Sequence, residues 1–446
     1  MKTTRTALAF LLGAAFFAAA YLGVRSITRA TSDGQAPGEF EETHVDARAA
    51  TAADLRIRAA EGQLKQRPQN PDGYNLLAAA YMQKARETGD FGFNAKAEAA
   101  LDESARVAPD DYDALKLHAK LLLTYHRFAE ALAAARRAQA QRPEDHDVYG
   151  AITDACVELG DYECAVEAAQ RMVDLRPDAA SYARVSYLRS LHGDREGAVE
   201  AMLVAVKAAD PRDPESVAWY RAHLGDELLN AGRREEAERE YERALAVFPD
   251  YHVALAAQAR ARLAAGDYTA AASLFERAQG RVPLPDTAAA LGDVYAKLGR
   301  AEDARRQYEL VEFIERTAGA APGTYSRQLA LFWADHDIKL DEALAVARRE
   351  RESRADIFTE DALAWCLYKK GQLAEARDSI ERALRLGTRD ARMLYHAGMI
   401  YTALGDARKG GDYLRRALEI NPGFDALQSE AARQSLASRA IKGSGV

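Results

Sequence analysis

The chain has few cysteines, and its basic residues do not outnumber its acidic ones. Three cysteines in 446 residues are too few for a disulfide-built scaffold, and their spacing matches no zinc motif. The formal net charge is -8, from 60 Lys and Arg against 68 Asp and Glu, so we do not expect a nucleic-acid partner attracted by a global positive field. Hydrophobic residues make up 48%, which excludes a largely disordered or collagen-like chain.

The first part of the chain is predicted to be a targeting segment. Basic residues flank an 18-residue apolar run at residues 7–24, as in the export signals of secreted proteins. A helix of this length spans about 27 Å, close to the thickness of a bilayer core, so residues 1–24 suit a retained membrane anchor as well as a cleaved signal peptide. The small residues Ala18 and Ala20 provide a cleavage site before Tyr21.

Residues 25–49 contain Ser, Thr, Gly, Pro and charged residues without helical periodicity, which is typical of a flexible tether. The abundance of Ala and Arg, together with the export signal, favours a bacterial protein. We therefore expect the protein to be exported to the periplasm, or anchored in the inner membrane and facing the periplasm. In the anchored form, residues 7–24 make the membrane contact.

Proline and glycine recur at a fixed interval through the rest of the chain. Proline marks boundaries between helices because it cannot donate a helical hydrogen bond. Glycine adopts positive φ readily, which suits a tight turn between two helices. The recurring prolines are Pro109, Pro143, Pro177 and Pro211, each 34 residues apart, and Pro249 and Pro283, again 34 apart. The recurring glycines are Gly160, Gly193, Gly232, Gly266, Gly299, Gly371 and Gly405.

The segments between these marks have a helical apolar period, so each unit is predicted to be a helix, a tight turn and a second helix. One position in the second helix is always small, as expected where two helices approach closely. Its residues are Ala131, Ala165, Ala198, Ala237, Ala271, Ala304, Ala343 and Ala376.

This unit resembles the tetratricopeptide repeat, which has a 34-residue period with Leu-Gly in the first helix, Ala and an aromatic residue in the second, and a terminal Pro. Leu224-Gly225, Ala237, Tyr241 and Pro249 form one of the best copies. The resemblance implies an all-α fold, an α-solenoid in which about ten repeats form a right-handed superhelix. Residues 71–424 would make up this superhelix, with a long concave groove lined mostly by the first helix of each repeat.

The two ends of such an array need covers, because a terminal repeat otherwise exposes its apolar face to water. Residues 50–70 are predicted to form an N-terminal covering helix. Residues 425–446 are predicted to form a C-terminal covering helix and tail.

Aromatic residues concentrate in the first helices of the last three repeats. Phe332, Trp365 and Met399 occupy equivalent positions and are predicted to form a ladder on the concave wall. Rigid aromatic anchors with a few charges are typical of a peptide-binding hot spot. Packing between helices is the alternative for each of them. The partner-binding candidates are Tyr325, Phe332, Phe358, Asp361, Trp365, Tyr368, Lys369, Tyr395 and Met399.

Four residues near this ladder are of metal-ligating types, namely Asp335, His336, Asp361 and His396. They come from three repeats without a local spacing rule, so we interpret them as ordinary polar side chains and expect no metal site.

Cys156 and Cys164 lie on the two helices of the third repeat, on either side of the Gly160 turn. In an oxidising compartment they can form a disulfide, although so short a loop gives limited stabilisation. Two buried thiols are the alternative.

The sequence contains no phosphate-binding P-loop, no nucleophile elbow, no zinc-protease motif and no dinucleotide fingerprint. We therefore expect no enzymatic activity, no catalytic residues and no cofactor. The leading hypothesis is a scaffold that binds a peptide or protein partner in its groove. Two alternatives stay open: a structural component of a membrane-associated assembly or transport machine, and a surface carbohydrate-binding protein whose aromatic residues stack on sugar rings.

Overall fold

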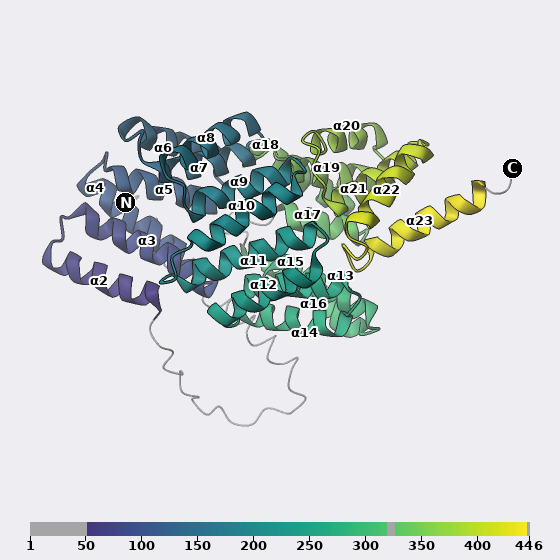
Figure 1. Ribbon diagram of the computed structural model, residues 1–446, viewed down its shortest axis with the longest axis horizontal. Helices are drawn as coiled ribbons and strands as arrows, with labels where there is room; N and C mark the ends of the chain where they lie inside the picture. Colours follow the sequence, from purple (N-terminus) through teal and green to yellow (C-terminus); the bar gives the residue numbers. More distant parts are fainter. Residues whose placement is uncertain (1–50, 319–325, 444–446) are drawn as a thin grey trace, which may run out of the picture. The chain divides into compact units, whose positions relative to one another are not determined.

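The computed structural model describes residues 51–318 and 326–443, and every regular element in these ranges is an α-helix (Figure 1). The prediction of an all-α fold is confirmed for them. The predicted hydrophobic segment and the tether lie outside the described residues, as does Tyr325. Within the described ranges, no helix combines the length and the apolar character needed to cross a membrane.

The helices follow one another as pairs joined by short turns. A single helix, α2 (Ala52–Gln66), precedes the pairs, and α23 (Gln428–Gly443) follows them. The pairs are α3 (Pro71–Thr88) with α4 (Gly92–Val107), α5 (Tyr112–Thr124) with α6 (Phe128–Gln141), α7 (His146–Glu158) with α8 (Tyr162–Leu175), α9 (Ala179–Leu191) with α10 (Arg195–Ala208), α11 (Pro214–Asn230) with α12 (Arg234–Val247), α13 (His252–Ala264) with α14 (Tyr268–Arg281), α15 (Pro285–Lys297) with α16 (Ala301–Ala318), α17 (Ser326–Asp335) with α18 (Leu340–Ser353), α19 (Ile357–Lys369) with α20 (Leu373–Ala383), and α21 (Ala391–Ala403) with α22 (Ala407–Ile420).

The chain divides into two compact units. The first consists of Met1–Leu121 together with Gly280–Pro283, and the second of Leu122–Gln279 and Leu284–Val446. In the described part of the first unit, α2 begins with a capping box between Thr51 and Asp54. The Asp54 carboxylate also accepts a hydrogen bond from Lys84 of α3 at 2.8 Å, which joins α2 to the first pair.

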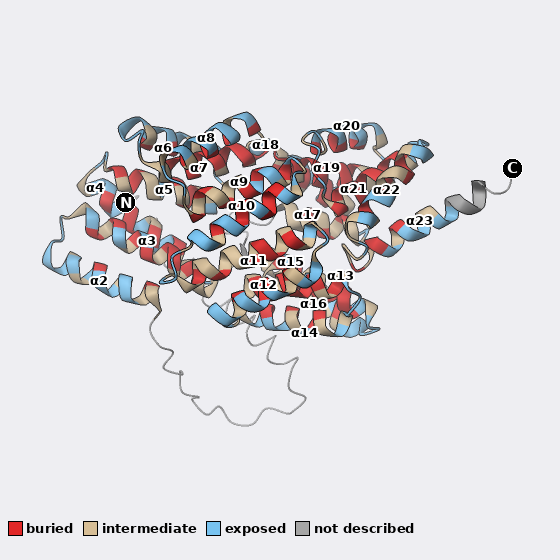
Figure 2. Ribbon diagram, viewed as in Figure 1, coloured by how far each residue is buried: buried red, intermediate tan, exposed pale blue. Residues whose placement is uncertain are grey.

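In the second unit, the helices of a pair approach closely because the residues between them are small. The recurrent alanines of the second helices are all buried, from Ala131 through Ala376. In the first helix of the fifth pair, a Cβ added to Gly225 would lie 2.3 Å from the Tyr241 ring. The repeated turn glycines, such as Gly232 with φ of 80°, have the positive φ expected from the sequence. Figure 2 shows the buried residues on the helix faces that meet neighbouring helices.

Segments of the second unit that are far apart in sequence also contact one another. The backbone N–H of Ala355, between α18 and α19, donates to the carbonyl of Glu158 at 3.0 Å. The Arg195 side chain at the start of α10 donates to the carbonyl of Arg389 at 3.2 Å. The third repeat therefore touches the junction of the eighth and ninth repeats, and the fourth touches the junction of the ninth and tenth. These contacts join repeats that are five or six units apart along the chain, which the repeat pattern alone did not predict.

Candidate functional site

In the second unit, the first helices α15, α17, α19 and α21 lie side by side. We call the surface that they form, on which the sequence placed the binding candidates, the first-helix face. Most of its large aromatic side chains are buried against neighbouring helices. Its charged side chains form pairs that join one repeat to the next.

Two of the three ladder residues lie in the core. Trp365 is 2% exposed and Phe332 is 4% exposed, whereas Met399 is half-buried. The Trp365 indole N–H donates to the Asp335 carboxylate at 2.8 Å, and its ring lies parallel to that of His396 with centroids 4.2 Å apart. For Phe332 and Trp365 the structure thus favours packing between helices. Trp365 contacts the repeats on either side, and Phe332 packs against Tyr308 of the preceding repeat.

Tyr395 and Asp361 are also buried, at 4% and 5% exposure. The Asp361 carboxylate lies 2.9 Å from Nδ1 of His396, and this pair connects α19 to α21 inside the protein. Burial removes the Asp361–His396 pair from the surface, so it supports the first-helix face from behind. The buried Nε2 atom of His396 has no hydrogen-bond partner.

The other described candidates reach solvent. Phe358, Tyr368 and Lys369 of α19 are half-buried, like Met399 of α21. The Lys369 ammonium lies 2.8 Å from the Asp337 carboxylate, and it also lies over the Trp365 ring. These side chains form an accessible margin next to the buried aromatic residues.

The charged groups expected beside the ladder do not assemble into a metal site. His336 Nε2 lies 2.8 Å from the Asp293 carboxylate, which also accepts from the Tyr308 hydroxyl at 2.8 Å. Burial raises the pKa of Asp335 to about 6. Across residues 51–318 and 326–443, no group of three or more His, Cys, Asp or Glu is placed to hold a metal ion.

Three important residues of the site were missed by the sequence reasoning: Arg392, Asp425 and Gln428. Arg392 lies one helical turn before His396 and was a recognisable first-helix position. Asp425 has the signature of a helix N-cap, but its partner comes from another element. No sequence signal identified Gln428, which is 6% exposed.

These residues belong to a contact between the first-helix face and residues 421–430, which we call the terminal segment. The Asp425 carboxylate accepts from the Arg392 guanidinium at 2.8 Å and from the backbone N–H groups of Leu427 and Gln428 at 2.8 and 2.9 Å. The Phe424 ring lies 5.6 Å from that of Tyr395. The terminal segment therefore places both an acid and an aromatic ring against α21.

The terminal segment also contacts earlier helices. The Gln428 side chain donates to Asp335 of α17, and Glu430 pairs with Lys297 of α15 at 2.5 Å. A Cβ added to Gly423 would lie 2.7 Å from the backbone of Ala264 at the end of α13. The segment thus crosses the first helices of several repeats instead of covering only the last one.

A cavity of about 220 Å³ remains at this contact. Its lining includes Ala264 and Gly266 from the end of α13 and the turn that follows it, Lys297 of α15, and Asp425 and Arg433 on the side of the terminal segment. The terminal segment therefore does not fill the surface on which it lies.

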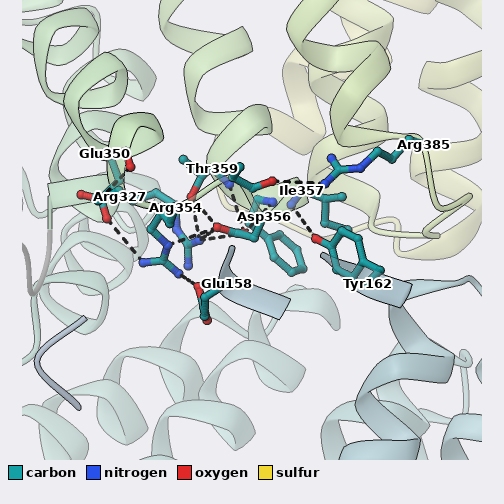
Figure 3. Close-up of polar contacts among 12 residues, drawn as sticks. Glu158, Tyr162, Arg327, Glu350, Arg354, Asp356, Ile357, Thr359 and Arg385 are labelled. Carbon is teal, nitrogen blue, oxygen red and sulfur yellow. Dashed lines mark hydrogen bonds and ion pairs between the residues drawn. The ribbon is translucent and has the colours of Figure 1, made fainter. Parts of the chain in front are cut away.

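A second charged cluster holds the distant repeats together, and Figure 3 shows it. Arg354 is 5% exposed and pairs with Glu158 of α7, with Asp356 at 3.1 Å and with Glu350 at 3.4 Å. Arg327 pairs with Asp356 at 3.1 Å from the other side. Each charge in this cluster has an opposite charge beside it, as buried ions require.

Hydrogen bonds extend this cluster along the chain. The backbone N–H of Ile357 donates to the Tyr162 hydroxyl at 2.9 Å, and the Arg385 guanidinium lies over the Tyr162 ring. Burial raises the pKa of Tyr162 to about 12, so its hydroxyl stays protonated. We call the contact of residues 158–162 with residues 354–357 the closure contact, because it joins repeats that are remote in sequence.

Cys156 and Cys164 form a disulfide that joins α7 and α8, with Cα atoms 5.9 Å apart. It lies within the same repeat that supplies Glu158 and Tyr162 to the closure contact. Cys366 is a free, buried thiol.

Comparison with known proteins identifies the same repeat. The family model described as tetratricopeptide repeat matches residues 116–180, 223–284, 256–323 and 362–423, together more than half of the chain. No curated protein sequence matches the chain.

Similar solved structures are remote. PilW, titled a widely conserved type IV pilus biogenesis factor, is 20% identical over 44% of this chain and 90% of its own, with a TM-score of 0.39. A tetratricopeptide repeat protein of Thermus thermophilus is 21% identical over 42% of this chain and 99% of its own, with a TM-score of 0.37. A human IFIT1 dimer with PPP-AAAA is 12% identical over 83% of this chain and 95% of its own, with a TM-score of 0.45.

The matched residues contain the recurrent buried alanines of six pairs and the Leu-Gly positions packed against tyrosine. The match and the packing therefore agree on the same repeating unit, and the chain belongs to the tetratricopeptide repeat family.

Proposed function

We propose that the protein is a non-enzymatic scaffold that holds a protein partner against the first-helix face of its C-terminal repeats. The observation that carries the proposal is the side-by-side arrangement of α15, α17, α19 and α21, which brings accessible groups from several repeats onto one surface. The Arg392 side chain is 40% exposed there even though it is paired. Accessible charges beside rigid rings are suited to binding an extended or helical peptide.

Within this proposal, the binding candidates have two roles. Phe358, Tyr368, Lys369 and Met399 reach solvent and would contact the partner. Tyr325, which lies outside the described residues, stays a candidate for the same role. Three buried candidates hold the surface in shape: Phe332, Asp361 and Trp365. Tyr395 is buried against Phe424 of the terminal segment.

The test is affinity capture from the native source with the full chain as bait, compared with the double variant Tyr368→Ala, Lys369→Ala. A matched control is Arg415→Ala, because Arg415 is an exposed residue of a second helix in the same repeats. We expect recovery of the partner to fall at least tenfold with the double variant and to stay unchanged with the control. Equal recovery with all three baits would remove this face from the proposed function.

We further propose that the protein is exported, with residues 7–24 either cleaved or retained as an anchor. Export is consistent with the Cys156–Cys164 disulfide, since disulfides persist in oxidising compartments. Mass spectrometry of the native N-terminus separates the two forms: a start at Tyr21 indicates cleavage, and an intact segment in the membrane fraction indicates an anchor. An intact N-terminus in the cytosolic fraction would contradict both.

A further inference from the structure

We infer that the terminal segment occupies, within its own chain, the site that receives the partner. The partner would then present a similar segment: a short peptide with an aromatic residue directly before an acidic residue, followed by the first turn of a helix. This inference rests on the proposed function and specifies its ligand.

The acid at position 425 is the best-defined feature of this contact. Its carboxylate receives a charge-assisted hydrogen bond from Arg392 while it also caps α23. The Asp425 side chain is only 9% exposed, whereas that of Arg392 stays 40% exposed. Arg392 is thus reachable from solvent, and a carboxylate from another chain can replace that of Asp425.

The neighbouring contacts fix the orientation of the bound segment and the number of residues that it needs. Phe424 lies against Tyr395 on one side of the acid, and Glu430 pairs with Lys297 five residues further on. In this arrangement the aromatic residue contacts the Tyr395 ring, the first acid the Arg392 guanidinium and the second acid the Lys297 ammonium. Tyr395 and Arg392 belong to one repeat and Lys297 to another. A peptide without the first acid would leave Arg392 paired only with Asp335 at 4.0 Å.

The contact also contains few buried apolar side chains of the terminal segment. Within the terminal segment, the one apolar residue that is buried is Ala426, at 5% exposure. The buried Oε1 atom of Gln428 has no hydrogen-bond partner, and the cavity of about 220 Å³ lies beside the segment. The helix pair α21 and α22, by contrast, encloses Leu414 completely. Polar contacts of this kind can be exchanged for equivalent ones from a partner at little cost in free energy.

Because the terminal segment is attached to the chain, it competes at a high effective concentration, on the order of millimolar for a short connection. A separate peptide of the same sequence should therefore bind the wild-type protein weakly. It should bind tightly once the attached copy is weakened.

The probe is a fluorescent synthetic peptide with the sequence of residues 421–433, titrated into the full chain and followed by fluorescence anisotropy. We expect the double variant Phe424→Ala, Asp425→Ala to bind this peptide at least tenfold more tightly than the wild type. Adding Arg392→Met to that variant should abolish binding. A control peptide with Asn in place of the acid should bind at least tenfold more weakly. Equal affinity for wild type and double variant, or binding that survives the loss of Arg392, would overturn the inference.

If circular dichroism shows that the double variant is unfolded, a measurement on the wild-type chain replaces it. Excess peptide should displace the attached segment and speed hydrogen exchange at its amides, from Ala426 to Glu430, at least fivefold. Unchanged exchange at saturating peptide would overturn the inference. If these peptide experiments fail but affinity capture depends on Tyr368 and Lys369, the inference is wrong and the proposed function stands. If the peptide binds as expected but affinity capture does not depend on Tyr368 and Lys369, the peptide site stands and the proposed partner contact is wrong.

Discussion

Replacing Arg354 by methionine tests whether the closure contact holds the second unit together. The guanidinium is 5% exposed and pairs with three carboxylates, from Glu158, Glu350 and Asp356. Methionine keeps much of the apolar stem but removes the charge, so the carboxylates lose a shared partner. Breaking a buried ion pair on one side typically costs about 3–5 kcal/mol.

The expected cost of Arg354→Met lies near the lower end of that range. Asp356 keeps Arg327 at 3.1 Å and also accepts from the backbone N–H of Phe358 at 2.9 Å, so its charge stays compensated. Glu158 and Glu350 are the carboxylates that lose the Arg354 charge as a partner. Burial raises the pKa of both carboxyls even with Arg354 present. Both can take up a proton, which limits the cost to about 3 kcal/mol.

Hydrogen exchange is the appropriate assay, because repeat arrays can open locally without unfolding throughout. The amides of Ala355 and Ile357 donate across the closure contact, to the Glu158 carbonyl and the Tyr162 hydroxyl. A loss of about 3 kcal/mol should speed their exchange by roughly 100-fold, since 1.4 kcal/mol corresponds to tenfold.

Two further variants make this result interpretable. Arg377→Met removes an exposed ion pair with Asp378 and should change exchange at these amides by less than twofold, because exposed pairs contribute little. Adding Glu158→Gln to Arg354→Met should recover part of the lost protection, because it removes the uncompensated charge. Unchanged exchange at Ala355 and Ile357 in Arg354→Met would refute the proposed role of the closure contact.

Three other predictions follow from the packing, the disulfide and the pKa values. Gly225→Ala should lower the free energy of unfolding by about 1–3 kcal/mol, because the added methyl group meets the Tyr241 ring. Gly62→Ala in the middle of α2 should raise the free energy of unfolding by about 0.5–1 kcal/mol, because the added methyl group has no atom within 4 Å. Urea unfolding measures both changes. Cys164→Ser should cost about 2–3 kcal/mol, and a reducing agent should lower the melting temperature of the wild type but not of the variant. Burial raises the pKa of Glu227 from its usual 4.5 to about 7, so ionisation of this carboxyl opposes folding. Its contribution to stability should therefore decline as pH rises from 4.5 to 7, and Glu227→Gln should remove that decline; a parallel loss of stability with pH in both proteins would contradict the assignment.

The repeating part of the fold was predictable because it depends on local chemistry. A glycine at each turn supplies positive φ, and an alanine in each second helix permits close approach, so both can be read from spacing alone. The boundaries between helices follow from the periodic prolines in the same way.

Long-range contacts were not predictable, because they depend on how far each repeat rotates relative to the next. Arg354 and Glu158 are 196 residues apart, and neither belongs to a recognisable motif. The burial of Trp365 likewise depends on Asp335 and His396 from adjacent repeats, which meet its N–H and its ring. The role of Asp425 was hidden because a helix cap and an ion-pair partner look the same in sequence.

The most direct test of the central claim, that the terminal segment lies on the first-helix face, is zero-length carbodiimide cross-linking of the full-length protein followed by mass spectrometry. The Lys297 ammonium and the Glu430 carboxylate are 2.5 Å apart, so we expect an amide cross-link between them, and we expect excess peptide of residues 421–433 to suppress it. The pair Lys339 and Glu312, also 2.5 Å apart, serves as an internal control that the peptide should leave unchanged. A cross-link at the control pair without one between Lys297 and Glu430 would contradict the claim.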